Sequence, residues 1–365
     1  MPERSSTGFI SLRTASRTDK TPEKPADAAS PSGDNAPRPH LLRSANGAAL
    51  SAASTAAHEA FSRLAVQLAM VARGQQETVE KLLCCFLSGG HALLEDLPGS
   101  GKTTLAKALC SGFGGVFRRA QFTPDLMPAD LLGSSLFNPQ SRAFEFHEGP
   151  VFCNLLLADE INRASPRAQS ALLEAMAEGQ VSVDGQSLKL PRPFFVVATQ
   201  NSAETHGAYP LPEAQLDRFC MRLSLARLTL EEETGLILSK SSAFANSSGV
   251  ESMGLDITRA AQEEAMSVAL SRPLADYIAR LARATREIPE ARLGVSARGA
   301  IALARAAQAR AWLRGQRAVL PSDVVALIHE CWAHRLGWAD SGAQSARDRE
   351  REAIERVLGQ EAMPQ

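Results

Sequence analysis

Apolar runs and helix-spaced apolar positions divide this chain into two parts. In the first part, three apolar runs end in polar residues: near Glu95, at Asp159 and Glu160, and at Asn201. Runs of this kind are typical of parallel strands that are covered on both faces. From 230 to 340 the apolar positions follow helical spacing instead. The pattern predicts an α/β fold with a parallel sheet, followed by an all-α domain.

The two ends of the chain differ from its middle. Residues 1–55 are rich in Ser, Thr, Ala and Pro with few large apolar side chains, so we expect a disordered tail. We expect the core at 56–228, with a helix and hairpin inserted at about 123–150, and the helical domain at 229–340. Residues 341–365 are charged and helix-prone, which predicts a frayed C-terminal tail.

The first apolar run leads into a Gly-rich turn and then a helix, in the stretch LLEDLPGSGKTTLAKAL at 93–109. Backbone N–H groups in such a turn, with the helix dipole, bind phosphate. Lys102 can then reach the β- and γ-phosphates, and Thr103 can hold Mg²⁺ through its hydroxyl. The strict pattern GxxxxGK[ST] has Gly where this chain has Asp96, a residue type that also tolerates unusual backbone angles. The predicted nucleotide-binding residues of this turn and helix are Pro98, Gly99, Ser100, Gly101, Lys102, Thr103 and Thr104.

Polar residues at the ends of the other two runs are expected beside this turn, because ligands of open α/β sheets bind beyond the carboxyl ends of the strands. Asp159 is the predicted Mg²⁺ ligand, through water, and Glu160 the predicted general base for an attacking water. Asn201 is a candidate for orienting that water. The alternatives are a solvated strand end for the two acids and a turn-capping role for the Asn.

Two further segments carry candidate residues with open alternatives. Arg218, in PLPEAQLDRF, is expected to pair with Asp217 or Glu213, or to point across to a neighbouring subunit. The break at Gly74-Gln75 comes just before the helix that precedes the phosphate-binding turn. From its spacing alone it is an ordinary turn, although it can pass over an adenine ring.

Composition excludes several other classes of protein. The 365-residue chain has a formal net charge of −1 and 22% charged residues, which gives no sign of a nucleic-acid binder. Its six cysteines include no CxxC pair, which predicts a reducing, cytoplasmic location and no zinc site. No apolar run approaches the roughly 20 residues of a membrane span, so we expect no stable membrane insertion.

Taken together, these motifs resemble the MoxR family of AAA+ ATPases over about residues 58–337. The resemblance implies an αβα nucleotide-binding core with a helical lid, a ring assembly, usually hexameric, and chaperone-like maturation of client proteins. It also implies a partner protein with a von Willebrand A domain. The stretches that carry it are LPGSGKTT, NLLLADEINRASPRAQSALLEAM, FFVVATQN, YPLPEAQLDRF and LGVSARGAIALARAAQARAWLRG.

The resemblance gives roles to the residues that match the family's motifs. Lys102 and Thr103 match Walker A, Asp159 and Glu160 match the Walker B pair, and Asn201 matches sensor 1.

Four more residues match family segments outside these motifs. Arg298 matches sensor 2, which contacts the γ-phosphate from the lid, and Arg218 is the best match to an arginine finger that acts on the next subunit. Gly74 and Gln75 match the adenine-side segment. Ala297 replaces the Pro that usually precedes the sensor 2 Arg, so we expect a looser start of that helix.

Other functions are compatible with the same core. A metal-chelatase-type motor subunit differs mainly in its partners, which co-purification would identify. A DNA-acting motor is disfavoured by the near-neutral charge, and salt-dependent DNA retention would support it. A nucleotide-binding scaffold without hydrolysis is disfavoured by the intact Lys102, Asp159, Glu160 and Asn201, and Mg²⁺-dependent phosphate release would exclude it.

Overall fold

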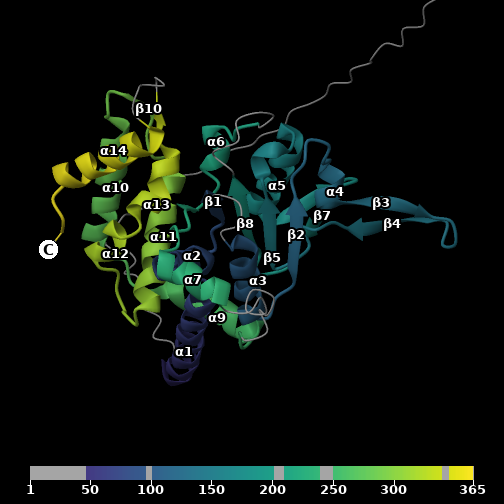
Figure 1. Ribbon diagram of the computed structural model, residues 1–365, viewed down its shortest axis with the longest axis horizontal. Helices are drawn as coiled ribbons and strands as arrows, with labels where there is room; N and C mark the ends of the chain where they lie inside the picture. The colour runs from purple at the N-terminus through teal and green to yellow at the C-terminus, as the bar shows by residue number, and fades with distance from the viewer. Residues whose placement is uncertain (1–46, 96–100, 201–208, 239–249, 339–344, 365) are drawn as a thin grey trace, which may run out of the picture. The chain divides into compact units, whose positions relative to one another are not determined.

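A central parallel sheet positions the predicted site. The computed structural model describes residues 47–95, 101–200, 209–238, 250–338 and 345–364. Five parallel strands follow one another in the order β2, β5, β8, β1, β9 (Figure 1). Their bounds are Phe117–Gln121, Leu155–Asp159, Phe195–Gln200, Ala92–Glu95 and Met221–Leu223.

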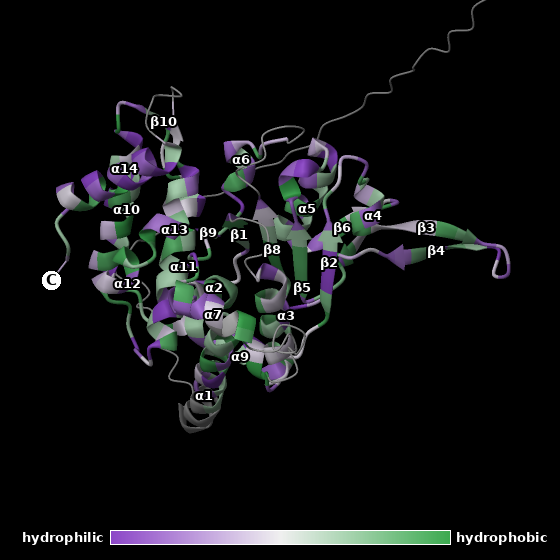
Figure 2. Ribbon diagram, in the orientation of Figure 1, coloured by the Kyte–Doolittle hydropathy of each residue, from purple (hydrophilic) through white to green (hydrophobic). Residues whose placement is uncertain are grey.

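The sheet is covered on both faces, which explains its unbroken apolar strands. Every residue of β5 is buried. Leu157 belongs to the same apolar cluster as α1, α2, α3 and the lid, whereas Leu156 belongs to a cluster with α5 and α4. Figure 2 shows the apolar residues gathered on the sheet and on the helix faces that meet it. The helices of the core are α1 (Gly47–Val71), α2 (Gln76–Leu87), α3 (Lys102–Phe113), α4 (Pro128–Leu132), α5 (Pro166–Glu178) and α6 (Glu213–Leu216).

The insertion between β2 and β5 contains the expected helix and hairpin. Helix α4 leads into the antiparallel strands β3 (Gly133–Asn138) and β4 (Ala143–Glu148), which extend away from the sheet (Figure 1). Phe137 and Phe144 are exposed on the hairpin and contact each other edge to face, with ring centroids 5.5 Å apart. A second hairpin joins β6 (Gln180–Val183) to β7 (Gln186–Lys189) through Asp184-Gly185, as its sequence indicates.

The lid is helical and packs on the β9 side of the sheet. Helix α11 contacts both α2 and α9, and α13 contacts β9. A short antiparallel pair, β10 (Ala291–Leu293) and β11 (Gly337–Trp338), interrupts the helices. The helices are α7 (Leu230–Leu238), α9 (Leu255–Ser267), α10 (Arg272–Arg286), α11 (Ala297–Leu313), α12 (Pro321–Val325), α13 (Ile328–Trp332) and α14 (Ala346–Gln360).

Two expectations for the chain ends are wrong. Helix α1 begins at Gly47, inside the segment expected to be disordered. The C-terminal segment is not a frayed end, because α14 buries Ala353, Ile354 and Val357 against the lid. Most charged residues of α14 are exposed, although Glu350 is buried on the same face as the apolar stripe, so the composition of the segment gave no sign of that stripe.

All six cysteines are free and buried. Among the described residues, no helix is both long enough and apolar enough to cross a membrane.

Candidate functional site

The helix that follows the Gly-rich turn begins as the motif requires. Gly101 adopts a left-handed conformation with φ of 87°, which glycine takes without strain, and α3 starts at Lys102. No side chain caps this helix N-terminus, and helix geometry leaves its first N–H groups free of intrahelical partners. Thr103 and Thr104 lie in this first turn. Pro98, Gly99 and Ser100 lie outside the described residues, as does Asp96.

The Walker B candidates lie at the carboxyl end of β5, between the ends of β2 and β8. The buried Asp159 carboxylate accepts a hydrogen bond from Arg119 Nε at 2.6 Å on Oδ2 and one from the Thr199 hydroxyl at 3.1 Å on Oδ1. Thr199 Oγ1 in turn accepts the backbone N–H of Glu160 at 2.9 Å. Hydrogen bonds therefore join the polar ends of β2, β5 and β8. Asn201, one residue beyond β8, lies outside the described residues.

Glu160 leaves the line of the strand. Its φ of 56° is left-handed, which is uncommon for a residue other than glycine. The carboxylate is half-buried, and its Oε2 accepts hydrogen bonds from Gln121 Nε2 at 2.8 Å and Arg163 Nη1 at 3.1 Å. Backbone strain of this kind concentrates at functional sites. Gln121 was not predicted as a site residue, although it ends the strand beside β5.

Arg218 forms neither of the two ion pairs expected for it. Its Nη1 donates a hydrogen bond to the backbone carbonyl of Leu173 on α5 at 2.6 Å. The expected partners are engaged elsewhere: Glu213 pairs with Arg292, and Asp217 pairs with Arg335 at 2.8 Å. That structural alternative is therefore wrong. The other alternative, a contact with a neighbouring subunit, stays a prediction.

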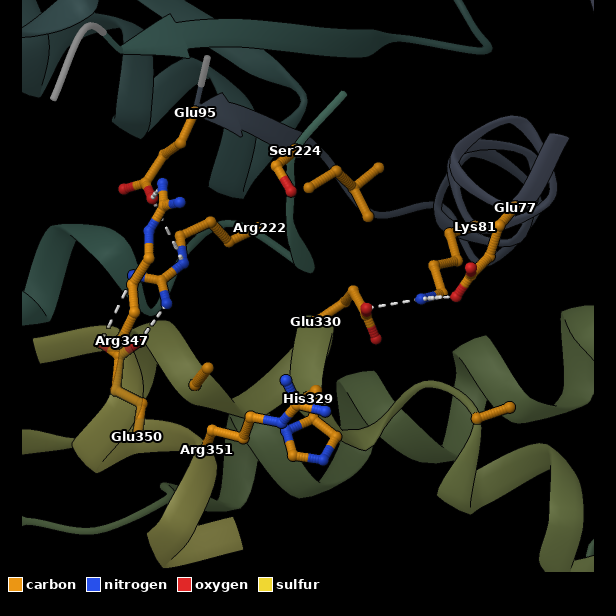
Figure 3. A pocket seen from close by; sticks show the side chains of 13 residues that line it. Glu77, Lys81, Glu95, Arg222, Ser224, His329, Glu330, Arg347, Glu350 and Arg351 are labelled. Carbon is orange, nitrogen blue, oxygen red and sulfur yellow. Dashed lines mark hydrogen bonds and ion pairs between the residues drawn. The ribbon is translucent and has the colours of Figure 1, made fainter. Parts of the chain in front are cut away.

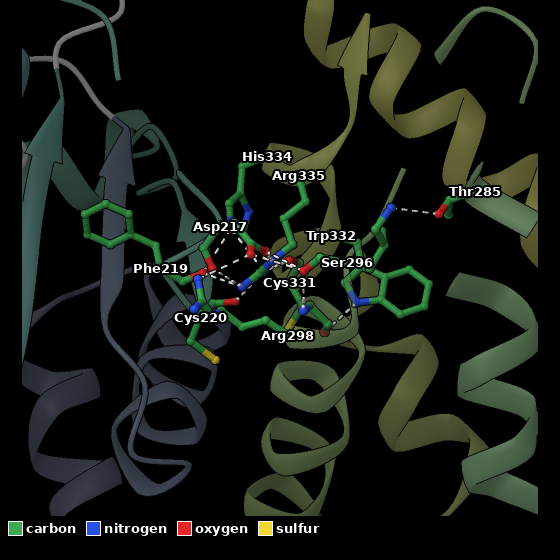
Figure 4. A network of polar contacts seen from close by, with 12 residues as sticks. Asp217, Phe219, Cys220, Thr285, Ser296, Arg298, Cys331, Trp332, His334 and Arg335 are labelled. Carbon is green, nitrogen blue, oxygen red and sulfur yellow. Dashed lines mark hydrogen bonds and ion pairs between the residues drawn. The ribbon is translucent and has the colours of Figure 1, made fainter. Parts of the chain in front are cut away.

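Arg298 opens the lid helix α11 close to the segment of Arg218. Its Nη1 lies 3.6 Å from Asp217 Oδ2. The preceding Ser296 caps α11 by accepting the N–H of Gly299 at 3.1 Å, and its hydroxyl donates to Asp217. The helix start is therefore fixed by a cap, not loosened by Ala297. Figure 4 shows these lid side chains directed toward Asp217 of the core.

The segment expected near the adenine is tied to the chain that leaves β9. Gly74 has a φ of 71°. The buried Gln75 side chain donates to the Ala226 carbonyl at 2.8 Å and accepts the Ala226 N–H at 2.8 Å. These two hydrogen bonds hold the turn that precedes α2 against the chain that follows β9, the edge strand beside β1.

Known proteins match this arrangement. Residues 91–221 match the family of ATPases associated with various cellular activities, and 283–357 match the AAA lid domain. Chaperone MoxR1 of Mycobacterium tuberculosis is 40% identical over 72% of this chain and 72% of its own length. The YeaC protein of Bacillus subtilis is 43% identical over 72% of this chain and 82% of its own length. A crystal structure from Cytophaga hutchinsonii, assigned by its name as an ATPase, has 34% identity and a TM-score of 0.78 over 87% of this chain and 99% of that one.

The chain belongs to the MoxR family of AAA+ ATPases. The expected fold, a parallel-sheet nucleotide-binding core with a helical lid, is thereby confirmed.

In this MoxR-family chain a cleft of about 490 Å³, lined mainly by charged side chains, lies between residues of the core and residues of the lid. It lies between α2, the end of β9, α13 and α14, and it reaches Glu95, which directly precedes the Gly-rich turn (Figure 3). Lys81 on its α2 wall pairs with Glu77 at 2.6 Å and with Glu330 of α13 at 2.5 Å. The cleft therefore extends from the end of β1 to the lid.

Four charged side chains form the inner wall of this cleft. Arg222 of β9 pairs with Glu350 of α14 and lies 3.7 Å from Glu95, and Arg347 of α14 lies 2.9 Å from Glu95. Burial raises the pKa of the Glu350 carboxyl, while Arg222 acts in the opposite direction. No local sequence signal indicates this cluster, because Arg222 and Glu350 are 128 residues apart.

Proposed function

We propose that this MoxR-family protein hydrolyses ATP with Mg²⁺ and uses the energy to remodel client proteins. One observation carries the proposal. The uncapped N-terminus of α3 follows strand β1, and the carboxylates of Asp159 and Glu160 end strand β5, with only β8 between these two strands. A phosphate-binding helix start and a pair of acids, both at the carboxyl ends of parallel strands, are two of the elements that enzymes use for phosphoryl transfer.

The ligand oxygens and N–H donors of the site fit Mg²⁺ and a nucleoside triphosphate. Hard cations prefer carboxylate and hydroxyl oxygens, which Asp159 and Thr103 offer. The first-turn N–H groups of α3 and the Lys102 ammonium suit the phosphates. Bound Mg²⁺ would neutralise phosphate charge as the γ-phosphate leaves. The residues of the chain then divide the work: Lys102 binds phosphate, and Glu160 accepts the proton of the attacking water.

The remaining predicted site residues are assigned to the attacking water, the γ-phosphate, the neighbouring subunit and the adenine base. We assign Asn201 to orienting the water, Arg298 to the γ-phosphate and Arg218 to the nucleotide of the next subunit. Gly74 and Gln75 border the adenine. These assignments rest on motif positions and on the contacts described above.

The assembly that we propose is a homo-oligomeric ring, with six subunits expected, in the cytoplasm. It works on a client together with a von Willebrand A domain protein, without nucleic acid or membrane insertion. Relatives named chaperone MoxR1 and protein MoxR support this direction. A chelatase-type role is the alternative, since a magnesium-chelatase subunit of Arabidopsis thaliana is 28% identical over half of this chain. The higher identity to the MoxR relatives favours the first role.

Two substitutions test the division of roles. Lys102→Ala should lose nucleotide affinity, because the phosphates lose a charged partner. Glu160→Gln should keep binding yet lower Mg²⁺-dependent phosphate release by about 10²-fold or more. Lys107→Ala on the same helix and Glu174→Gln on α5 are matched controls, because both side chains are exposed. Equal loss of binding in both test variants would contradict the assignment.

Glu160→Gln also tests the proposed client activity. Held with ATP, the variant should retain client and partner proteins, which can be identified after affinity purification. Recovery of metal-chelatase subunits, and of no other von Willebrand A domain protein, would favour the chelatase-type role.

A further inference from the structure

Asp217 is shared by three donors that come from the lid. Its carboxylate pairs with Arg335 Nε at 2.8 Å, accepts the Ser296 hydroxyl at 3.0 Å and lies 3.6 Å from Arg298 Nη1 (Figure 4). Resting on the proposed function, we propose that Asp217 is a positioning residue that holds Arg298 by an exchangeable ion pair, in competition with the γ-phosphate.

The contact between Arg335 and Asp217 is the strongly held part of this cluster. The Arg335 side chain is only 2% exposed. Besides Asp217 it donates to the backbone carbonyls of Phe219 at 2.6 Å and Cys220 at 3.2 Å, and to that of Cys331. Moving a buried guanidinium with this many acceptors costs free energy, because each acceptor would lose its hydrogen-bond donor. Arg335 therefore fixes residues 217–220 against the lid whether or not Arg298 is present.

The Arg298 side of the cluster is weak by comparison. Its side chain is 60% exposed, and a separation of 3.6 Å exceeds hydrogen-bond length. Water and salt screen such a pair, so it contributes little to holding the lid. When Arg298 leaves, Asp217 keeps Arg335 and Ser296, so no buried charge becomes unpaired. A triphosphate carries more negative charge than one carboxylate. It can therefore replace Asp217 as the ion-pair partner of Arg298 at a small cost in free energy.

Arg218 lies next to Asp217, in the segment that Arg335 fixes. Arg218 follows Asp217 in the chain, and its guanidinium is held by the Leu173 carbonyl on α5. The buried Phe219 anchors the other side of the same segment. The exchange of Arg298 between Asp217 and the γ-phosphate therefore takes place beside the residue that we assign to the next subunit, in a segment that Arg335 keeps in place.

The test compares the affinities for ATP and ADP, since only ATP carries the γ-phosphate. In Asp217→Asn the competitor loses its charge, so the ratio of ATP to ADP affinity should rise by about threefold, the effect of one exposed ion pair. In the Arg298→Gln background the same substitution should leave the ratio unchanged. The turnover number should fall while KM falls, because Arg298 is no longer drawn back after hydrolysis. Affinities are measured by calorimetry at a protein concentration where mass measurement shows complete assembly.

Asp323→Asn is the matched control. Asp323 is a buried lid carboxylate that pairs with Arg310 at 2.8 Å and lies 3.6 Å from Arg314, so its geometry repeats that of Asp217 away from Arg298. Its loss should lower stability but leave the affinity ratio unchanged. If Asp217→Asn does not fold, Asp217→Glu keeps the charge beside Arg335 and extends the carboxylate toward Arg298. The ratio should then fall below that of the wild type.

Two outcomes overturn the inference. An unchanged ratio in the Asp217 variant that folds, or a change that persists without Arg298, shows that Asp217 is only structural. In either case ATP binding and hydrolysis by the wild type leave the proposed function standing. A wild-type protein that binds no Mg²⁺-ATP at all contradicts the proposed function, and this inference with it.

Discussion

Arg119 Nε lies 2.6 Å from Asp159 Oδ2, so the predicted metal ligand already has a cationic neighbour. The two residues lie on the adjacent strands β2 and β5. The other carboxylate oxygen of Asp159 accepts the Thr199 hydroxyl. A cation that approaches Asp159 must therefore share this carboxylate with Arg119.

This relationship predicts a change in metal dependence. Arg119 is half exposed, so its pair with Asp159 is worth about 1 kcal/mol or less. Arg119→Ala should lower the Mg²⁺ concentration for half-maximal ATPase activity by about twofold to fivefold, measured by titration at saturating ATP. Arg118→Ala, the exposed neighbour on the same strand, is the control and should leave the titration unchanged. A higher Mg²⁺ requirement in Arg119→Ala would show that the Arg supports the metal site.

Mixing two inactive proteins tests Arg218. An Arg supplied by a neighbour is worth about 10³–10⁵ in rate for phosphoryl transfer. Arg218→Ala and Lys102→Ala should each be inactive, while mixed rings pair an intact Gly-rich turn with an intact Arg218 at some interfaces. Phosphate release should then return in part and depend on protein concentration. If phosphate release does not return although mass measurement shows mixed rings, Arg218 does not act on the neighbouring nucleotide. Its role would then be the structural hydrogen bond to Leu173.

His91 predicts an acid-sensitive fold. The buried ring accepts the Val196 N–H at 3.0 Å on Nδ1 and donates to the Met176 carbonyl at 3.1 Å through Nε2, which requires the neutral form. Burial lowers the pKa of His91 from 6.5 to about 4. Between these values the unfolded chain binds a proton that the folded chain does not. The free energy of unfolding should therefore fall by about 3 kcal/mol as the pH drops from 6.5 to 4.

Urea unfolding at several pH values measures this loss. His91→Gln should reduce the slope of stability against pH in this window, whatever its effect at neutral pH. Burial and Arg335 likewise lower the pKa of His334, so part of the slope should remain. His147→Gln, at an exposed histidine of β4, should leave the slope as it is in the wild type. A slope unaffected by His91→Gln would contradict the prediction.

The N-terminal boundary can be tested by truncation. Removing residues 1–45 should leave the melting temperature and the ATPase rate nearly unchanged, as expected for a segment that buries little apolar surface. Phe61 of α1, in contrast, is fully buried and packs edge to face on Trp312 of the lid, with centroids 5.6 Å apart. Phe61→Ala should cost about 3–5 kcal/mol in unfolding free energy. A truncation as damaging as Phe61→Ala would mean that the tail docks on the core.

The sequence indicated those features that depend on neighbouring residues. Strand β5 is buried on both faces, so its run of apolar residues could be recognised, and Asp159 and Glu160 mark where it ends. Helix α3 is marked by its glycine and by Lys102. The start of α1 was missed because an Ala- and Ser-rich composition was taken for disorder, although Ala has the highest helix propensity.

Contacts between distant segments had no such signal. Asp217 and Arg335 are 118 residues apart, and Arg218 reaches α5 across 45 residues. Both arginines have carboxylates nearby in sequence, but their partners lie elsewhere: Arg335 pairs with Asp217, and Arg218 bonds to a backbone carbonyl of α5. Only the packing of the folded chain decides these partners, so the expected pairs of Arg218 were wrong.

The burial of every cysteine makes this protein a convenient subject for spectroscopy. Burial also raises the pKa of the Cys110 and Cys153 thiols to about 12, which keeps them from reacting near neutral pH. A single cysteine introduced at the exposed Phe144 can therefore carry a dye while all native thiols stay in place. Fluorescence from that dye would follow the β3–β4 hairpin through the ATP cycle, and slow labelling of the native thiols would report how often the molecule opens.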